Sequence, residues 1–143
     1  MARRPGIANA ARLRRTLQRI GKENGEIVRP LLDELEDSAI DLQDQIEYNI
    51  QGRGLVDEGD LLNSVARVKQ SGGFVWKVGF FRKGAVRKWR RAGWRAHFAE
   101  FGTRRQPATP IIAPAVVEIF PEAVANIKRE VDRALERFAN GRR

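Results

Sequence analysis

Apolar residues recur every three or four positions between residues 27 and 50, and no other feature constrains the fold of this chain as strongly. The apolar side of the helix that this pattern predicts consists of Val28, Leu31, Leu32, Leu35, Ala39, Leu42, Ile46 and Ile50. Carboxylates fill the other side: Asp33, Glu34, Glu36, Asp37, Asp41, Asp44 and Glu47. Pro30 falls in the first turn, where its missing N–H is tolerated, and Gly52 and Gly54 end the helix. A helix with one apolar side has to bury that side, so these residues predict a core helix.

A hairpin is expected after this helix, and a basic helix before it. In the stretch 74–82, the aromatic or apolar residues Phe74, Trp76, Val78 and Phe80 stand at every second position. This period of two predicts a strand. Residues 61–70 alternate less cleanly and are expected to form the partner strand, with Ser71-Gly72-Gly73 as the turn between them. Residues 7–22 predict an arginine-rich helix; because its apolar stripe is thin, a basic arm that orders only on its partner is an equal alternative.

The C-terminal third predicts a short helix, an extended segment and a second long helix. Residues 94–101 give one or two helical turns that Gly102 ends, and the proline-rich stretch 103–114 is expected to run extended. Residues 115–139 predict the long helix, which Pro121 either kinks or begins anew. Its apolar stripe is expected to consist of Val116, Ile119 or Phe120, Val124, Ile127, Val131, Leu135 and Phe138.

This order of elements predicts an α+β fold, in which two long helices pack on a small antiparallel sheet with an N-terminal basic helical extension. Residues 1–25 are expected to be a basic arm or helix, and residues 26–143 a single domain. No apolar stretch reaches the ~18 residues that cross a bilayer, so no contact with a membrane is expected. The residues that follow Met1 lack an apolar core segment, so they are not expected to be a secretory signal.

The composition argues against catalysis. The chain has no cysteine and one histidine, His97, which excludes disulfides, thiolate metal sites and multi-histidine metal sites. No glycine loop of a phosphate-binding type is present, and no serine has the setting of a nucleophile elbow. We therefore expect a protein that is not an enzyme, with no cofactor and no small-molecule substrate.

Charge is segregated along the chain, which carries a net charge of +9. Residues 1–22 and 61–99 hold basic residues and no acid, whereas residues 23–60 are predominantly acidic. Such blocks suit a chain that meets copies of itself or a polyanion, or they neutralise one another within one molecule. Trp89 and Trp94 lie among the basic residues, where they either stack on bases or anchor a protein contact. The residues predicted to contact a partner or DNA are Arg3, Arg4, Arg12, Arg14, Arg15, Arg82, Lys83, Arg87, Lys88, Trp89, Arg90, Arg91 and Arg95.

Two motifs near the last helix carry a family resemblance. They are His97-Phe98-Ala99-Glu100-Phe101-Gly102-Thr103 and Pro110-Ile111-Ile112-Ala113-Pro114-Ala115, and Glu58-Gly59-Asp60-Leu61-Leu62-Asn63-Ser64-Val65 precedes them. The chain resembles the tail-completion, or head–tail joining, family of long-tailed bacteriophages, which is related to the minor tail protein Z of lambdoid phages. The resemblance covers about residues 27–140. Ala113 stands where the family has an arginine, and residues 1–25 look like an extension.

The resemblance implies a structural protein of the virion neck or upper tail, present in the host cytoplasm during assembly. Such proteins form rings, usually hexameric, that complete the tail and join it to the DNA-filled head, in contact with other neck, connector and tail proteins and with DNA in the channel. The implied subunit-interface residues are Trp94, His97, Phe98, Glu100, Phe101, Gly102, Thr103, Pro107, Pro110 and Pro114. A tail terminator or a head-closure protein is an alternative within this class, and a nucleic-acid-binding protein is an alternative outside it.

Overall fold

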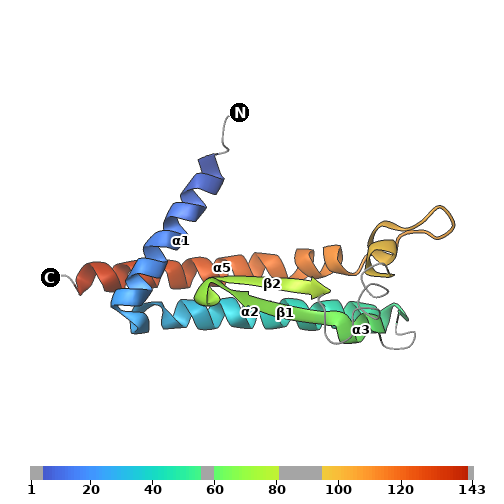
Figure 1. Cartoon of the computed structure of the whole chain (residues 1–143), viewed down its shortest axis with the longest axis horizontal. Helices are drawn as coiled ribbons and strands as arrows, with labels where there is room; N and C mark the ends of the chain where they lie inside the picture. The colour runs from blue at the N-terminus through green and yellow to red at the C-terminus, as the bar shows by residue number, and fades with distance from the viewer. Residues whose placement is uncertain (1–4, 56–59, 81–94, 142–143) are drawn as a thin grey trace.

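Two long antiparallel helices form the body of the protein in the computed structural model, which describes residues 5–55, 60–80 and 95–141. They are α2 (Gly25–Gly52) and α5 (Ile112–Asn140), and they run side by side for most of the length of the molecule (Figure 1). The amphipathic α1 (Pro5–Glu23) precedes them and leaves the body at an angle, so that its N-terminal end projects outward (Figure 1). The predicted N-terminal helix and the predicted α+β fold are thus confirmed.

The core helix α2 follows from its apolar pattern, and it extends two residues further at each end than predicted. Its buried residues are Val28, Leu31, Ala39, Ile46 and Ile50. The helix ends through a Schellman motif, in which Leu55 N–H donates to the Ile50 carbonyl at 3.0 Å and Gly54 N–H to the Gln51 carbonyl at 3.1 Å. Gly54 has φ +67°, the left-handed conformation that this motif requires and that glycine adopts without strain.

The helix α5 differs from the prediction at its start. It begins at Ile112 rather than at residue 115, so Pro114 lies in its first turn, where a missing N–H is tolerated. It continues through Pro121 as one helix. Proline at this position leaves the carbonyl of Val117 without its usual helical donor. Because Val117 is 76% exposed, water can satisfy that carbonyl.

The hairpin consists of β1 (Val65–Gln70) and β2 (Val75–Phe80), which pair antiparallel from Val65↔Phe80 to Gln70↔Val75. The prediction of a strand from residue 61 was wrong at its first residues, since Asp60–Ser64 form the short helix α3. One helical turn places both Leu61 and Val65 in the core, and the Ser64 hydroxyl donates to the Leu61 carbonyl at 2.8 Å. The predicted turn is the 3-10 turn η2 (Ser71–Gly73), in which all three residues have positive φ.

The sheet depends on α2 for its stability, because an isolated two-stranded hairpin is marginal in water. The Arg67 guanidinium donates to the Gln43 amide oxygen of α2 at 2.9 Å. Lys69 lies 3.6 Å from the carboxylate of Glu36, also on α2. Arg67 and Lys69 lie on the same sheet face as Val65, because side chains along a strand point to alternate faces. Since both residues contact α2, this face of the hairpin lies toward α2.

The core divides into two clusters. One contains Ile46 and Ile50 of α2 with Leu61, Val65, Ala96, Ile111 and Ala115. The other contains Leu17 of α1, Leu31 of α2 and Ala134 of α5, with Ile127, Val131 and Leu135 packed against them. The C-terminal half of α1 therefore packs onto both long helices. None of the described helices is long and apolar enough to cross a membrane.

Burial in the first cluster leads to a stability prediction. Ile46→Ala is expected to lower the free energy of unfolding by about 2–4 kcal/mol, because it opens a cavity at a residue that is 0% exposed. Tyr48→Ala, two residues further along α2 and 69% exposed, is the matched control and is expected to change it by less than about 0.5 kcal/mol. Urea denaturation followed by circular dichroism measures both. Equal losses at the two positions would contradict this packing.

Candidate oligomer interface

The two motifs of the last third are joined by one carboxylate. Glu100 Oε2 accepts hydrogen bonds from the backbone N–H groups of Ile111 at 2.8 Å and Ile112 at 2.9 Å, and Oε1 accepts one from Ala113 at 2.9 Å. These N–H groups lie at the start of α5, where a helix has no internal acceptors for them. Ile111, the N-cap residue, offers no side-chain acceptor of its own. Glu100 therefore caps α5 from a separate helix, formed by residues 95–101, and we call this contact the Glu100 clamp.

The clamp also suits the charge of Glu100. Partial burial by itself raises the pKa of the Glu100 carboxyl, but the three backbone N–H groups and the positive charge of Arg53 outweigh it. The pKa of Glu100 therefore lies below its ordinary value. The N-terminal end of the α5 dipole favours the ionised form in the same direction.

The segment between the motifs folds back on the short helix. Gly102 has φ +73°, and a Cβ there would meet the Ala108 nitrogen at 2.8 Å. The Thr103 N–H donates to the Gln106 carbonyl at 2.8 Å, which closes a turn, and the Thr109 N–H donates to the Ala99 carbonyl at 2.7 Å. The prediction that residues 103–114 run extended was therefore wrong at both ends. Residues 103–106 form a turn, and residues 112–114 belong to α5. The resulting loop projects from the end of the molecule (Figure 1).

Aromatic side chains are exposed beside the clamp. Phe101 is 72% exposed and Phe98 is 44% exposed, and His97 is exposed as well. The rings of His97 and Phe101 lie 5.0 Å apart between centroids, and those of His97 and Phe98 lie 6.2 Å apart. We call these three residues the aromatic patch. Because the clamp fixes the helix that carries them, the patch is presented on rigid backbone, which reduces the entropy that a binding partner must overcome.

The predicted interface residues fall into two groups. Phe98, Phe101, Thr103 and Pro107 are exposed with His97, whereas Glu100, Gly102, Pro110 and Pro114 are half-buried and hold the connecting segment together. Trp94 lies outside the described residues.

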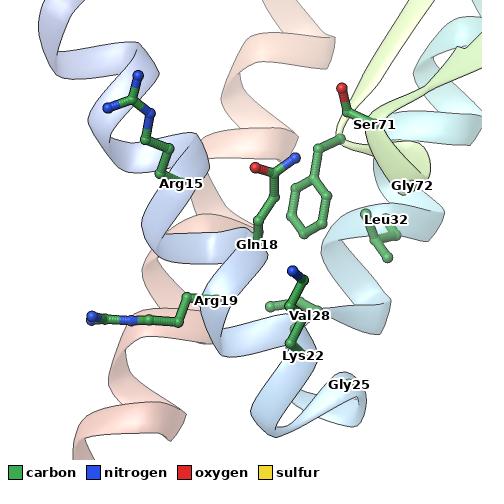
Figure 2. Close-up of a pocket in the computed structure, with 11 residues that line it drawn as sticks. Arg15, Gln18, Arg19, Lys22, Gly25, Val28, Leu32, Ser71 and Gly72 are labelled. Carbon is green, nitrogen blue, oxygen red and sulfur yellow. The ribbon is translucent and has the colours of Figure 1, made fainter.

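The predicted partner-contact residues are only partly described. Arg12, Arg14 and Arg15 are exposed on α1, and Arg95 is half-buried in the short helix. The others lie outside the described residues: Arg3, Arg4, Arg82, Lys83, Arg87, Lys88, Trp89, Arg90 and Arg91. A cavity of about 650 Å³ lies between α1, the start of α2 and the η2 turn, with Arg15, Arg19 and Lys22 among its lining residues. The Gln18 side chain points toward α2 and the η2 turn, whereas the Arg19 side chain extends away from α2 (Figure 2).

Several exposed apolar residues were missed by the sequence pattern. The stripe of the last helix was predicted to contain Ile119 or Phe120, followed by Val124. Ile119 is half-buried, whereas Phe120 and Val124 are 58% and 47% exposed, and Val117 beside them is 76% exposed. A period of 3.6 residues marks an apolar face without saying whether the same chain covers it. In the described part of the chain, no group of three or more His, Cys, Asp or Glu side chains is placed to hold a metal ion.

The clamp gives a pH-dependent stability prediction. Glu100→Ala is expected to lower the free energy of unfolding by about 1–2 kcal/mol at pH 7, because three helix-start N–H groups lose their acceptor. The folded-state pKa is depressed, so the contribution of Glu100 is complete above the ordinary glutamate pKa of about 4.3 and is lost as the pH falls through the folded-state value. The gap between wild type and variant should thus narrow in acid. Urea denaturation at several pH values measures it.

Glu122→Ala is the control for this prediction, since Glu122 is an exposed glutamate beyond the first turn of α5. It is expected to change the free energy of unfolding by less than about 0.5 kcal/mol at any of these pH values. If Glu100→Ala were equally silent at pH 7, the clamp would not contribute to the stability of the protein.

Comparison with known proteins neither supports nor contradicts the resemblance. No protein-family model, no curated protein and no solved structure matches this chain. The features that bear on function are therefore the two motifs and the Glu100 clamp that joins them.

Proposed function

We propose that this chain is a structural protein of the neck or upper tail of a long-tailed bacteriophage. Its copies form a homo-oligomeric ring, with six subunits as the number that the resemblance implies. The ring completes the tail and joins it to the DNA-filled head, and its partners are neck, connector and tail proteins. The role requires specific protein contacts and no chemistry, so no catalytic residue is assigned.

The observation that carries this proposal is the clamp between the two motifs. The resemblance rests on a Glu-Phe-Gly-Thr run and a Pro-x-x-x-Pro-Ala run, which are separate in sequence. Glu100 of the first run binds the backbone of residues 111–113 in the second. The paired motifs thus have a common physical role, which is to fix the start of α5 and to hold the aromatic patch beside it.

The charge pattern is compatible with a ring. A ring needs two different, complementary surfaces on each subunit, because the same pair of surfaces repeats at every contact. The N-terminal half of α5 exposes the carboxylates Glu118 and Glu122. The helix α1 exposes arginines instead, so one molecule carries separate surfaces of opposite charge.

A patch variant tests the proposal. Phe101→Ser is expected to weaken self-association at least about tenfold, because Phe101 is the more exposed phenylalanine of the aromatic patch that the clamp holds at the proposed interface. Tyr48→Ser, which removes an equally exposed aromatic residue from α2, is the matched control and should leave association unchanged. Sedimentation velocity over a range of protein concentrations measures both. A wild-type protein that stays monomeric and is absent from purified virions would overturn the proposal.

Nucleic-acid binding is a second candidate, favoured by the surface of α1. Arg12, Arg14, Arg15 and Arg19 are all exposed, and the only acid in this helix is Glu23 at its end. Arginine makes bidentate contacts with phosphate, so such a helix can bind a nucleic-acid backbone without reading its sequence.

The salt dependence of duplex binding tests this candidate. For a DNA-binding protein, each phosphate contact contributes about −0.9 to the slope of log K against log salt. Replacing Arg12 and Arg15 by alanine is then expected to make the slope shallower by about 1.8. Fluorescence anisotropy with a labelled duplex measures the slope. Binding that vanishes near physiological salt would remove the second candidate.

A further inference from the structure

The helix α5 carries one apolar face of which only half is covered. Apolar residues follow one another at alternating spacings of three and four along α5, as on the contact face of a coiled coil: Val117, Phe120, Val124, Ile127, Val131 and Ala134. In the C-terminal half of this face, Ile127 and Val131 pack in the cluster that contains Leu17 of α1. In the N-terminal half, Val117, Phe120 and Val124 stay between 47% and 76% exposed. We call these three residues the α5 ridge.

A groove lies beneath α1 where this helix leaves the body. It measures about 430 Å³ and is lined almost entirely by apolar side chains, among them Leu13 and Leu17 of α1, Leu31 and Leu35 of α2, and Ile127 and Val131 of α5. Leu13 is still 39% exposed, although it lines the groove. We call this feature the α1 groove. Figure 1 shows α1 diverging from the two long helices toward its N-terminus.

The two features have opposite charges at their borders. Among the described residues that line the α1 groove, Arg14 is the charged one. The exposed carboxylates Glu118 and Glu122 lie beside the α5 ridge. An apolar contact with oppositely charged borders favours the correct register and attracts the two surfaces before contact.

We infer that the α5 ridge of one copy docks in the α1 groove of the next copy. This inference deepens the proposed ring function and rests on it. One copy cannot fill its own groove with its own ridge, because Val124 of the ridge and Ile127 of the groove are neighbours on the same helix. Each copy that docks leaves one ridge and one groove open, so the contact repeats until a ring closes.

A symmetric contact between two ridges is disfavoured by charge. Two antiparallel α5 helices that meet at Phe120 would bring Glu118 of one copy toward Glu122 of the other. Like charges brought together at a contact cost free energy, whereas the groove offers Arg14 to the same carboxylates. The second copy is therefore expected to present its groove and not its ridge.

Cysteine cross-linking tests the inference cleanly, because the chain has no cysteine of its own. One protein carries Leu13→Cys in the groove and a second, distinguishable by size, carries Phe120→Cys in the ridge. The two are mixed and treated with a short bis-maleimide. The expected product is the Leu13→Cys and Phe120→Cys heterodimer, at least tenfold above each pairing with Tyr48→Cys, an exposed position outside both features.

The other outcomes overturn the inference in distinguishable ways. Mainly Phe120→Cys homodimers would show a symmetric ridge contact, and cross-linking no greater than with Tyr48→Cys would show that another surface is used. Either result, in a sample that still assembles, leaves the proposed ring intact. A sample that is monomeric by sedimentation removes both the inference and the ring.

A second variant separates loss of contact from loss of fold. Phe120→Asp is expected to reduce self-association at least tenfold with an unchanged circular dichroism spectrum, because Phe120 is 58% exposed and contributes little to the core. Tyr48→Asp is the matched control. Full association of the Phe120→Asp protein would contradict the inference.

Discussion

The Glu100 carboxylate holds together the part of this molecule on which the functional argument depends. It supplies acceptors to three N–H groups at the start of α5, and in doing so it fixes the short helix at 95–101 against the long one. Burial alone would raise the pKa of this carboxyl, but the N–H groups and Arg53 bring it below its ordinary value. The aromatic side chains next to it remain exposed, although the backbone that carries them is held rigidly. A surface of this kind suits a permanent contact with another protein subunit.

The body of the protein consists of α2 packed against α5, with a buried apolar cluster toward each end of the pair. The cluster with Ile46 and Ile50 supports α3, the hairpin and the clamp, whereas the cluster with Leu31 and Ala134 anchors α1. Between these clusters the apolar face of α5 is exposed at Val117, Phe120 and Val124. Exposed large apolar residues in one row on a helix are typical of a contact surface, and the α1 groove is the partner surface that we propose for it.

The sequence predicted the two long helices and the hairpin because their patterns are local. The spacing from Val28 to Ile50 was enough for α2, and the period of two around Trp76 was enough for β2. Pro114 was misread as part of an extended stretch because proline suits both that conformation and the first turn of a helix. The clamp was beyond prediction, since Glu100 and Ile111 are eleven positions apart and only the fold of the loop brings them together. The exposure of Phe120 could not be predicted either. An apolar helix face carries the same types of residue whether it packs in the protein's own core or against another chain.

Native mass spectrometry of the wild-type protein shows whether the exposed apolar surfaces join copies of this chain into a closed ring, as we propose. We expect one assembly of a single mass, a whole multiple of the 16.2 kDa chain, with six as the expected number of subunits. A protein that remains monomeric at every concentration would contradict it, and so would one that forms only symmetric dimers.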